Sequence, residues 1–274
     1  MARILSLKST YKLNSGFEIP LLGFGTSSVV QQAIAYGYRA VDAAAFYQNE
    51  AACADGLLKS GVPREQFFYT SKVPPNMVSY EGAKAAISQS FNEVLDLKYI
   101  DLMLLHAPWG GSEGRFGAWK ALVEAGEVGT VRSIGVSNWG VAHLAQLEQH
   151  ITEIDSQQGK GGVLSVNQIE LHPWLPHRDI VEWCKKHGVI VQAWAPLAQA
   201  TRWGDKTIQS IAHRTGKTEA QILLRWSLQK GFNPLPKSVT ASRIAENINI
   251  FDFTLSEAEM AALETDEYDF HGWE

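Results

Sequence analysis

Three apolar runs, each ending in an ionisable side chain, constrain the fold of this chain more than any other feature. The runs occupy residues 38–42, 67–72 and 100–106 and end in Asp42, Lys72 and His106. Lys72 lies 30 residues after Asp42, and His106 lies 34 residues after Lys72. That interval holds about one strand, one helix and two loops, which is typical of a βα repeat. We therefore predict parallel strands joined by helices.

The polar residues at the strand ends indicate a shared site. In a parallel barrel the carboxyl ends of the strands meet at one rim, where such residues are commonly catalytic. Tyr47 lies five residues after Asp42, on the segment that leaves the strand. The alternative is that each polar residue only stops a strand, and that His106 is satisfied inside the core. We favour a site of Asp42, Tyr47, Lys72 and His106, because the alternative requires four separate coincidences.

One (β/α)8 TIM barrel with an N-terminal β-hairpin accounts for the whole chain. Its 274 residues are close to the roughly 250 typical of this α/β fold. Residues 11–19 predict the hairpin, and residues 107–114, rich in glycine and proline, predict a loop over the rim. The eight strands are expected at residues 21–25, 38–42, 67–72, 100–106, 131–137, 163–169, 189–194 and 232–235. Without a linker or second repeat, we expect one domain, 1–274.

The overall charge favours a small-molecule partner. The net charge is −5, and no run of five Lys or Arg residues occurs, which argues against nucleic acid or an anionic membrane surface. No obligate protein partner is evident. Cys53 and Cys184 lie on predicted helices without CxxC spacing, so we expect buried thiols, no disulfide and no metal site. The first residues lack a signal peptide's apolar segment, and we expect a cytoplasmic location.

With these residues placed, the sequence resembles the aldo-keto reductase family from the hairpin to Met260. The motifs that carry the resemblance stand in family order as YRAVDAAAFYQNE, TSKV, DLMLLHAP, SIGVSN, NQIELHP, QAWAPL and PKSVTASRIAEN. The resemblance implies a barrel that binds NADP(H) across its rim and transfers hydride to an aldehyde or ketone.

The resemblance also implies a role for each of the four residues. Tyr47 would be the proton donor, tuned by Lys72 and Asp42, and His106 would orient the carbonyl. A free phenol, with a pKa near 10, is a weak acid at neutral pH. We expect the Lys72 ammonium to lower the pKa of Tyr47 towards neutrality, and Asp42 to hold the lysine charged. A neutral His106 could donate a hydrogen bond to the developing oxyanion.

No GxGxxG motif follows a strand, so the barrel must hold its cofactor in another way. By resemblance, Ser137, Asn138 and Gln168 would hold the carboxamide, and Trp194 would stack on the nicotinamide unless it is core packing. The predicted cofactor contacts are Gly25, Thr26, Ser137, Asn138, Gln168, Trp194, Ala195, Pro196, Leu197, Lys237, Ser238, Val239, Thr240, Arg243, Glu246 and Asn247.

The last of these contacts predict which dinucleotide binds. Lys237 and Arg243 follow the eighth strand, where barrel enzymes often bind phosphate, and supply two positive charges for a 2′-phosphate. This predicts NADP rather than NAD, whose free ribose hydroxyl would more naturally meet a carboxylate. Arg243 alone could also be a solvated surface residue.

The chain departs from the family pattern around the expected substrate pocket. The first loop and helix are short, and Ser27 and Ala107 stand where relatives often carry tryptophan. Ser27, Ala107 and Trp109 are the expected substrate contacts, and Trp139 and Trp174 could either line the pocket or be structural. We predict a wide pocket that accepts bulky or cyclic carbonyls.

Two rival functions remain open at this point. A non-catalytic NADP-binding barrel, acting as a redox sensor or regulatory subunit, would retain the cofactor residues. A barrel metal-dependent hydrolase is suggested only by the eight histidines, and no HxH pair ends a strand.

Overall fold

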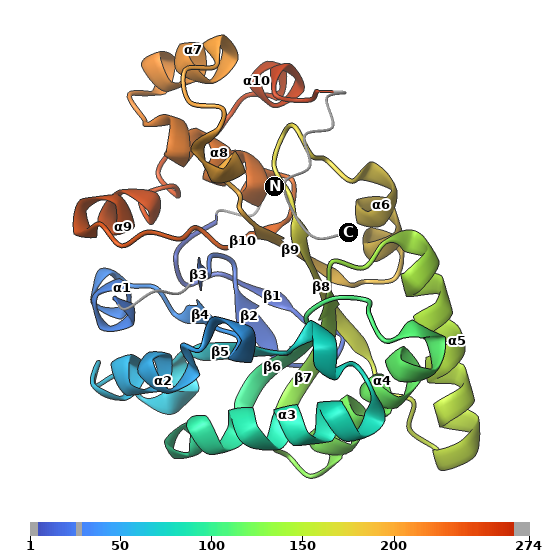
Figure 1. The fold of residues 1–274 in the computed structure, drawn as a ribbon. Helices are drawn as coiled ribbons and strands as arrows, with labels where there is room; N and C mark the ends of the chain where they lie inside the picture. The colour runs from blue at the N-terminus through green and yellow to red at the C-terminus, as the bar shows by residue number, and fades with distance from the viewer. Residues whose placement is uncertain (1–4, 26–28, 266–274) are drawn as a thin grey trace.

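The computed structural model describes residues 5–25 and 29–265, and its centre is a parallel sheet rolled into a barrel (Figure 1). Eight strands form this sheet in sequence order. They are β3 (Phe24–Gly25), β4 (Ala40–Asp42), β5 (Phe68–Val73), β6 (Ile100–Leu105), β7 (Val131–Ser137), β8 (Leu164–Glu170), β9 (Ile190–Trp194) and β10 (Asn233–Pro234).

The barrel closes where its first and last strands meet. The Gly23 amide donates to the Pro234 carbonyl at 3.1 Å, and the Gly25 amide donates to the Pro236 carbonyl at 3.0 Å. A Cβ at Gly23 would lie 2.3 Å from the Leu235 side chain, so a larger residue here would have to displace that side chain. The expected (β/α)8 barrel is confirmed.

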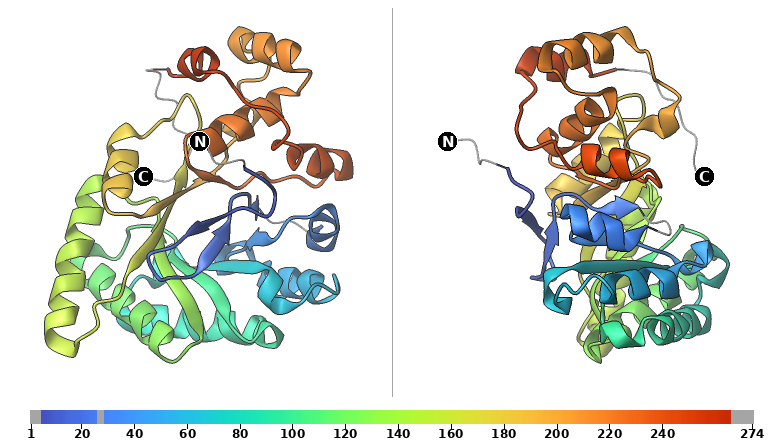
Figure 2. Two further views of the ribbon diagram at one scale, coloured as in Figure 1. Left: turned by 180° about the vertical axis from the view of Figure 1, so that it is seen from behind. Right: turned by 90° about the vertical axis from the view of Figure 1, so that its left-hand side faces the viewer.

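Helices surround the barrel on its outer side (Figures 1 and 2). They are α1 (Val30–Tyr36), α2 (Glu50–Leu58), α3 (Tyr80–Glu93), α4 (Gly111–Glu127), α5 (Val141–Gln158), α6 (Arg178–Lys186), α7 (Lys206–Thr215), α8 (Glu219–Gln229), α9 (Ala241–Asn247) and α10 (Glu257–Ala262). Capping boxes begin α8 at Thr218 and α10 at Ser256, because each cap hydroxyl accepts from an amide three residues later. None of the helices described is long and apolar enough to cross a membrane.

The N-terminal hairpin covers the end of the barrel where the strands begin (Figure 2). It pairs β1 (Thr10–Lys12) with β2 (Glu18–Pro20), and its turn contains Gly16 at φ +90°. Asn14 in the turn donates to the Leu164 carbonyl at the start of β8, 3.0 Å away. Ile19 is fully buried against the barrel interior. The opposite end, where the strands finish, is left for a site.

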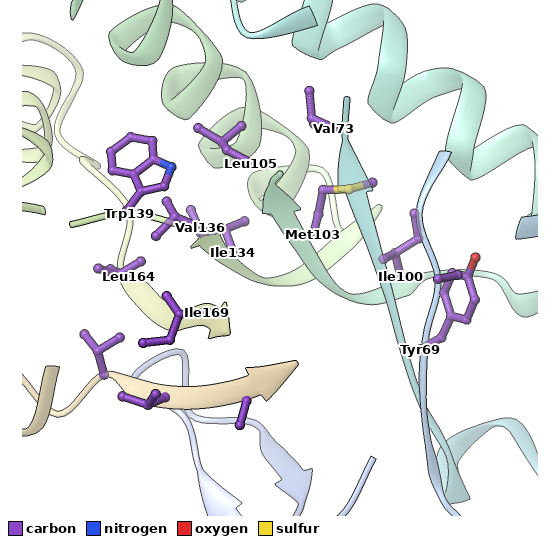
Figure 3. Packing of buried hydrophobic residues seen from close by; sticks show 14 of the residues in the cluster. Tyr69, Val73, Ile100, Met103, Leu105, Ile134, Val136, Trp139, Leu164 and Ile169 are labelled. Carbon is purple, nitrogen blue, oxygen red and sulfur yellow. The ribbon is translucent and has the colours of Figure 1, made fainter. Parts of the chain in front are cut away.

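The main hydrophobic core lies between the strands and the helices. Figure 3 shows side chains of successive strands, among them Met103, Leu105, Val136 and Ile169, packed in one continuous cluster. Trp139 belongs to this cluster and is fully buried. Burying each large apolar side chain of this kind contributes about 1.5–3 kcal/mol.

The predicted loop over residues 107–114 is wrong in its second half, because α4 begins at Gly111. The glycines there serve close packing rather than a loop. A Cβ at Gly114 would lie 2.6 Å from the Val78 carbonyl oxygen, and one at Gly117 would lie 2.8 Å from the Tyr80 amide. The actual loop after His106 is therefore only four residues long, 107–110.

Candidate active site

Four ionisable side chains from separate segments meet at the carboxyl ends of the strands. Asp42 ends β4, Lys72 lies near the end of β5, His106 directly follows β6, and Tyr47 lies in a short 3-10 turn. The Lys72 ammonium donates to Asp42 Oδ2 at 2.6 Å and to the Ala43 carbonyl at 2.9 Å. The Tyr47 hydroxyl is 3.2 Å from His106 Nε2, and Lys72 Nζ is 5.1 Å from the centroid of the Tyr47 ring.

Burial divides this group into a floor and an open face. Lys72 is 0% exposed and Asp42 6%, whereas Tyr47 is 48% exposed. A buried ammonium is costly unless it is paired and hydrogen-bonded, and the contacts to Asp42 and Ala43 meet that need. Asp42 therefore lies at the floor of the cleft with Lys72 beneath it, and the Tyr47–His106 pair faces the space above.

The environment keeps His106 neutral. Burial, with a smaller contribution from the Lys72 ammonium, lowers the pKa of His106 to about 3. Its imidazole thus carries one N–H hydrogen at neutral pH and can share a hydrogen bond with the Tyr47 hydroxyl. This direction agrees with the neutral imidazole expected from the sequence.

The expectation that the pKa of Tyr47 falls towards neutrality is wrong for the protein by itself. Loss of hydration raises the pKa of this phenol, and that effect outweighs the lowering by the Lys72 ammonium. The Asp42 carboxylate, paired with that ammonium, also raises it. Water at the cleft mouth limits the rise, because nearly half of Tyr47 is exposed. The phenol therefore remains protonated at neutral pH.

A cleft of about 1360 Å³ runs from this group across the rim. Asp42, Tyr47 and His106 line it, whereas Lys72 lies beneath it. The predicted cofactor contacts that line it are Gly25, Ser137, Asn138, Gln168, Trp194, Ala195, Pro196, Leu197, Lys237, Ser238, Val239, Thr240, Arg243, Glu246 and Asn247. Thr26 and Ser27 lie outside the described residues.

None of the three tryptophans considered as pocket residues, Trp109, Trp139 and Trp174, lines the cleft. Trp139 and Trp174 are buried in the main core and have a structural role. Ala107 is 1% exposed, and neither it nor the exposed Trp109 lines the cleft. Buried and surface tryptophans look alike in sequence, so only the packing separates them.

Several residues that line the cleft were missed by the sequence reasoning. They are Gln48, Asn49, Ala52, Gln199, Ala200, Trp203, Thr218, Glu219, Ala220 and Leu235. The capping box at Thr218 marked the start of α8, but it gave no sign that this helix end faces the rim. The segment with Gln199 and Trp203 follows β9, and its place directly after a barrel strand was the available signal.

Asn138 ties three parts of the rim together. It adopts a left-handed conformation at φ +64°. Its side-chain amide donates to the His106 carbonyl at 3.0 Å and accepts from the Trp194 indole at 2.9 Å. The next residue back, Ser137, donates its hydroxyl hydrogen to the Gln168 carbonyl at 2.8 Å. Through Asn138, these bonds connect the Trp194 ring to the backbone at His106.

Two features of the cleft fit a nicotinamide dinucleotide phosphate. Gln168 Nε2 donates to Asp42 Oδ1 at 2.8 Å and to Gln192 Oε1 at 2.5 Å, so Gln168 Oε1 remains available as an acceptor for an amide. At the other end, Lys237 and Arg243 are exposed, and neither forms an ion pair with a carboxylate in the described chain. An acceptor at one end and two cations at the other suit a carboxamide and a phosphate.

Comparisons with known proteins place this geometry in context. The model of the Aldo/keto reductase family matches residues 26–266. The chain is 37% identical over 279 residues to an uncharacterized oxidoreductase of Saccharomyces cerevisiae, covering 96% of each. It is 40% identical over 264 residues to the glyoxal reductase of Bacillus subtilis, covering 93% of this chain and 91% of that one. A crystal structure of an aldo/keto reductase from Brucella melitensis matches with a TM-score of 0.85 at 36% identity, covering 93% of this chain and 98% of that one.

Proposed function

Because this chain belongs to the aldo/keto reductase family, we propose that it reduces aldehydes or ketones to alcohols with NADPH, using Tyr47 as the proton donor. The observation that carries the proposal is the Tyr47 hydroxyl 3.2 Å from His106 Nε2, above the buried Lys72–Asp42 pair. Two hydrogen-bonding groups thus face one small region of the cleft, where a carbonyl oxygen could contact both.

The chain's own residues would handle the charge that develops on the substrate. A reduced nicotinamide supplies the hydride when the dinucleotide is bound. His106, which stays neutral, orients the carbonyl by a hydrogen bond to its oxygen. Tyr47 then donates its hydroxyl proton to that oxygen, because its raised pKa keeps the proton in place until negative charge forms. The buried Lys72 ammonium favours the resulting phenolate, and Asp42 holds the ammonium in position.

The preference for NADPH rests on the two cations at the far end of the cleft. Lys237 and Arg243 would hold the 2′-phosphate, and Gln168 with Ser137 and Asn138 would hold the carboxamide. Because a hydrogen bond to a charged group contributes about 1.5–3 kcal/mol, Lys237→Ser or Arg243→Ser should weaken NADPH binding about tenfold to hundredfold. NADH binding should change by less than about threefold, because NADH has no phosphate at that position.

The decisive experiment follows the loss of reduced-nicotinamide absorbance against a panel of carbonyls. The panel should include glyoxal, since a Bacillus relative is named for its reduction, together with aryl and cyclic ketones. General acid catalysis contributes about a hundredfold to ten-thousandfold, so Tyr47→Phe should lower kcat by that factor. The matched control is Tyr36→Phe on α1, a partly exposed tyrosine outside the cleft, which should retain full activity.

The outcomes separate the candidate functions. Turnover by the wild type and by Tyr36→Phe, but not by Tyr47→Phe, would support the reductase with its proton donor. Tight NADPH binding without turnover of any carbonyl would instead favour the non-catalytic barrel. A Tyr47→Phe protein that retains most of its kcat would exclude Tyr47 as the proton donor.

A further inference from the structure

Three side-chain amides inside the barrel form a hydrogen-bonded chain that ends at Asp42. Gln168 on β8 donates to Asp42 Oδ1 at 2.8 Å and to Gln192 Oε1 at 2.5 Å. Gln192 on β9 donates to Asn233 Oδ1 on β10 at 2.7 Å, and Asn233 donates to the Pro20 backbone carbonyl at 2.7 Å. We call Gln168, Gln192 and Asn233 the amide relay.

The relay runs between the two ends of the barrel. Its members are in register on three neighbouring strands, where Gln192 pairs with both Gln168 and Asn233. Pro20 ends the hairpin strand β2 at the closed end, whereas Asp42 lies at the floor of the cleft. Gln168 lines the cleft, but Gln192 and Asn233 do not. All three amides are buried.

The direction of every bond in the relay is determined by its ends. A backbone carbonyl can only accept, so Asn233 must turn Nδ2 towards Pro20 and leave Oδ1 facing Gln192. Gln192 must therefore donate through Nε2 and accept through Oε1. The carboxylate of Asp42, paired with a lysine, also only accepts. Gln168 consequently uses both of its N–H hydrogens inside the barrel.

This order has two consequences at the cleft. Gln168 can offer only its Oε1 to a bound molecule, so it selects a donor such as an amide NH₂. Asp42 has both oxygens engaged, one by Lys72 and one by Gln168, so the carboxylate cannot rotate freely. The relay therefore fixes the orientation of the Gln168 amide, and through Gln168 it also restrains Asp42 in the ion pair with Lys72.

We infer that Gln192 and Asn233 are positioning residues for the reaction, which fix the orientation of Gln168 and hold the Asp42–Lys72 pair in place through the hairpin carbonyl of Pro20. This inference rests on the proposed carbonyl reduction. Neither residue touches the cleft, so neither is itself a catalytic residue.

A purely structural role would not require amides at these positions. The barrel interior below the relay is apolar and contains Phe68, Leu102, Leu104 and Val166. Replacing two bonded polar partners by apolar groups of similar shape can be nearly neutral for stability. Met and Val could therefore supply the packing alone. Only a side chain that both donates and accepts a hydrogen bond can fix the orientation of the neighbouring amide.

The test compares Gln192→Met with the double variant Gln192→Met/Asn233→Val and with a control. The single variant leaves Asn233 Oδ1 and one Gln168 N–H without partners, whereas the double variant removes both amides and leaves the Pro20 carbonyl and that Gln168 N–H without partners. The control is Asn167→Val on β8, next to Gln168 in sequence. It is an equally buried amide that bonds the Trp139 carbonyl at 2.9 Å and takes no part in the relay.

Four quantities are measured for each protein: kcat and KM for the best carbonyl with NADPH, the Kd for NADP+ from tryptophan fluorescence, and the free energy of unfolding in urea. We expect both relay variants to lose about threefold to tenfold in kcat and in NADP+ affinity, with the carbonyl KM within about twofold of wild type. The double variant should be no more active than the single variant, because neither restores the bond to Gln168. Asn167→Val should lose stability and keep kcat.

Each outcome decides the inference. Relay variants that turn over and bind NADP+ like wild type, whatever their stability, would overturn it and leave the reductase proposal intact. Recovery of kcat and of NADP+ affinity in the double variant would overturn it as well. A wild-type chain that neither binds NADP+ nor reduces any carbonyl would overturn the proposed function, and this inference with it.

Discussion

The burial of His106 predicts a specific dependence of stability on pH. In the folded chain the pKa of this imidazole is lowered from 6.5 to about 3, and His106 is only 4% exposed. Between those two values the unfolded chain binds a proton that the folded chain does not. Folding is therefore undisturbed above about pH 6.5 and loses stability as the pH falls from there towards 3.

The size of this effect follows from the two pKa values. Between pH 7 and pH 4.5, protonation of the unfolded chain at this one site should remove about 2.5 kcal/mol from the free energy of unfolding. In His106→Gln that contribution disappears, although the side chain can still hydrogen-bond Tyr47. Urea unfolding at both pH values should therefore show a smaller acid loss for His106→Gln than for wild type, by about 2.5 kcal/mol.

Comparing each protein with itself at two pH values cancels any packing defect of the substitution. The exposed His213 on α7 offers a matched control, and His213→Gln should leave the acid loss unchanged. If wild type and His106→Gln lose stability in parallel, within about 1 kcal/mol, then burial does not keep His106 neutral. The neutral imidazole in the proposed mechanism would then have no basis.

Three further predictions concern the ion pair, the packing of α4 and the pocket. Asp42→Asn leaves the buried Lys72 ammonium without its charged partner and should lower the free energy of unfolding by about 3–5 kcal/mol. Adding Lys72→Met should restore part of that loss. Strictly additive losses for the two substitutions would show that the pair is not coupled. Gly117→Ala places a methyl 2.8 Å from the Tyr80 amide and should lower the free energy of unfolding by about 1–3 kcal/mol. Gly126→Ala in the same helix, with its nearest contact at 3.9 Å, should be neutral or stabilising. Urea unfolding measures both effects. If the substrate pocket is wide, kcat/KM for cyclic or aryl ketones should match or exceed that for small aldehydes, and a strong preference for small aldehydes would contradict it.

The barrel could be predicted from the sequence because ionisable residues end the apolar runs at regular intervals along the chain. Asp42, Lys72 and His106 each end an apolar run, and that position alone indicates the rim they share. The capping boxes at Thr218 and Ser256 are equally local signals, since they depend on residues three apart. Local patterns of this kind survive in sequence because the physics that produces them is local.

Features that depend on distant contacts could not be predicted in this way. The bond from Gln168 to Asp42 joins residues 126 apart, and nothing near either residue signals it. The glycines around Gly114 resembled a loop, because close helix packing and chain flexibility both favour glycine. The pKa of Tyr47 was misjudged because the attraction to Lys72 can be estimated from sequence, whereas the loss of hydration depends on the shape of the cleft.

The barrel is closed by hydrogen bonds between its first strand, β3, and the segment that contains its last strand, β10. These neighbouring strands are only two residues long, whereas the strands on the far side run to six or seven. Gly25, on one side of this junction, and Leu235 and Lys237, on the other, all line the cleft. A molecule that fills the cleft thus contacts both sides of the junction between the two shortest strands of the barrel. Its binding should therefore stabilise the barrel against separation of these two strands.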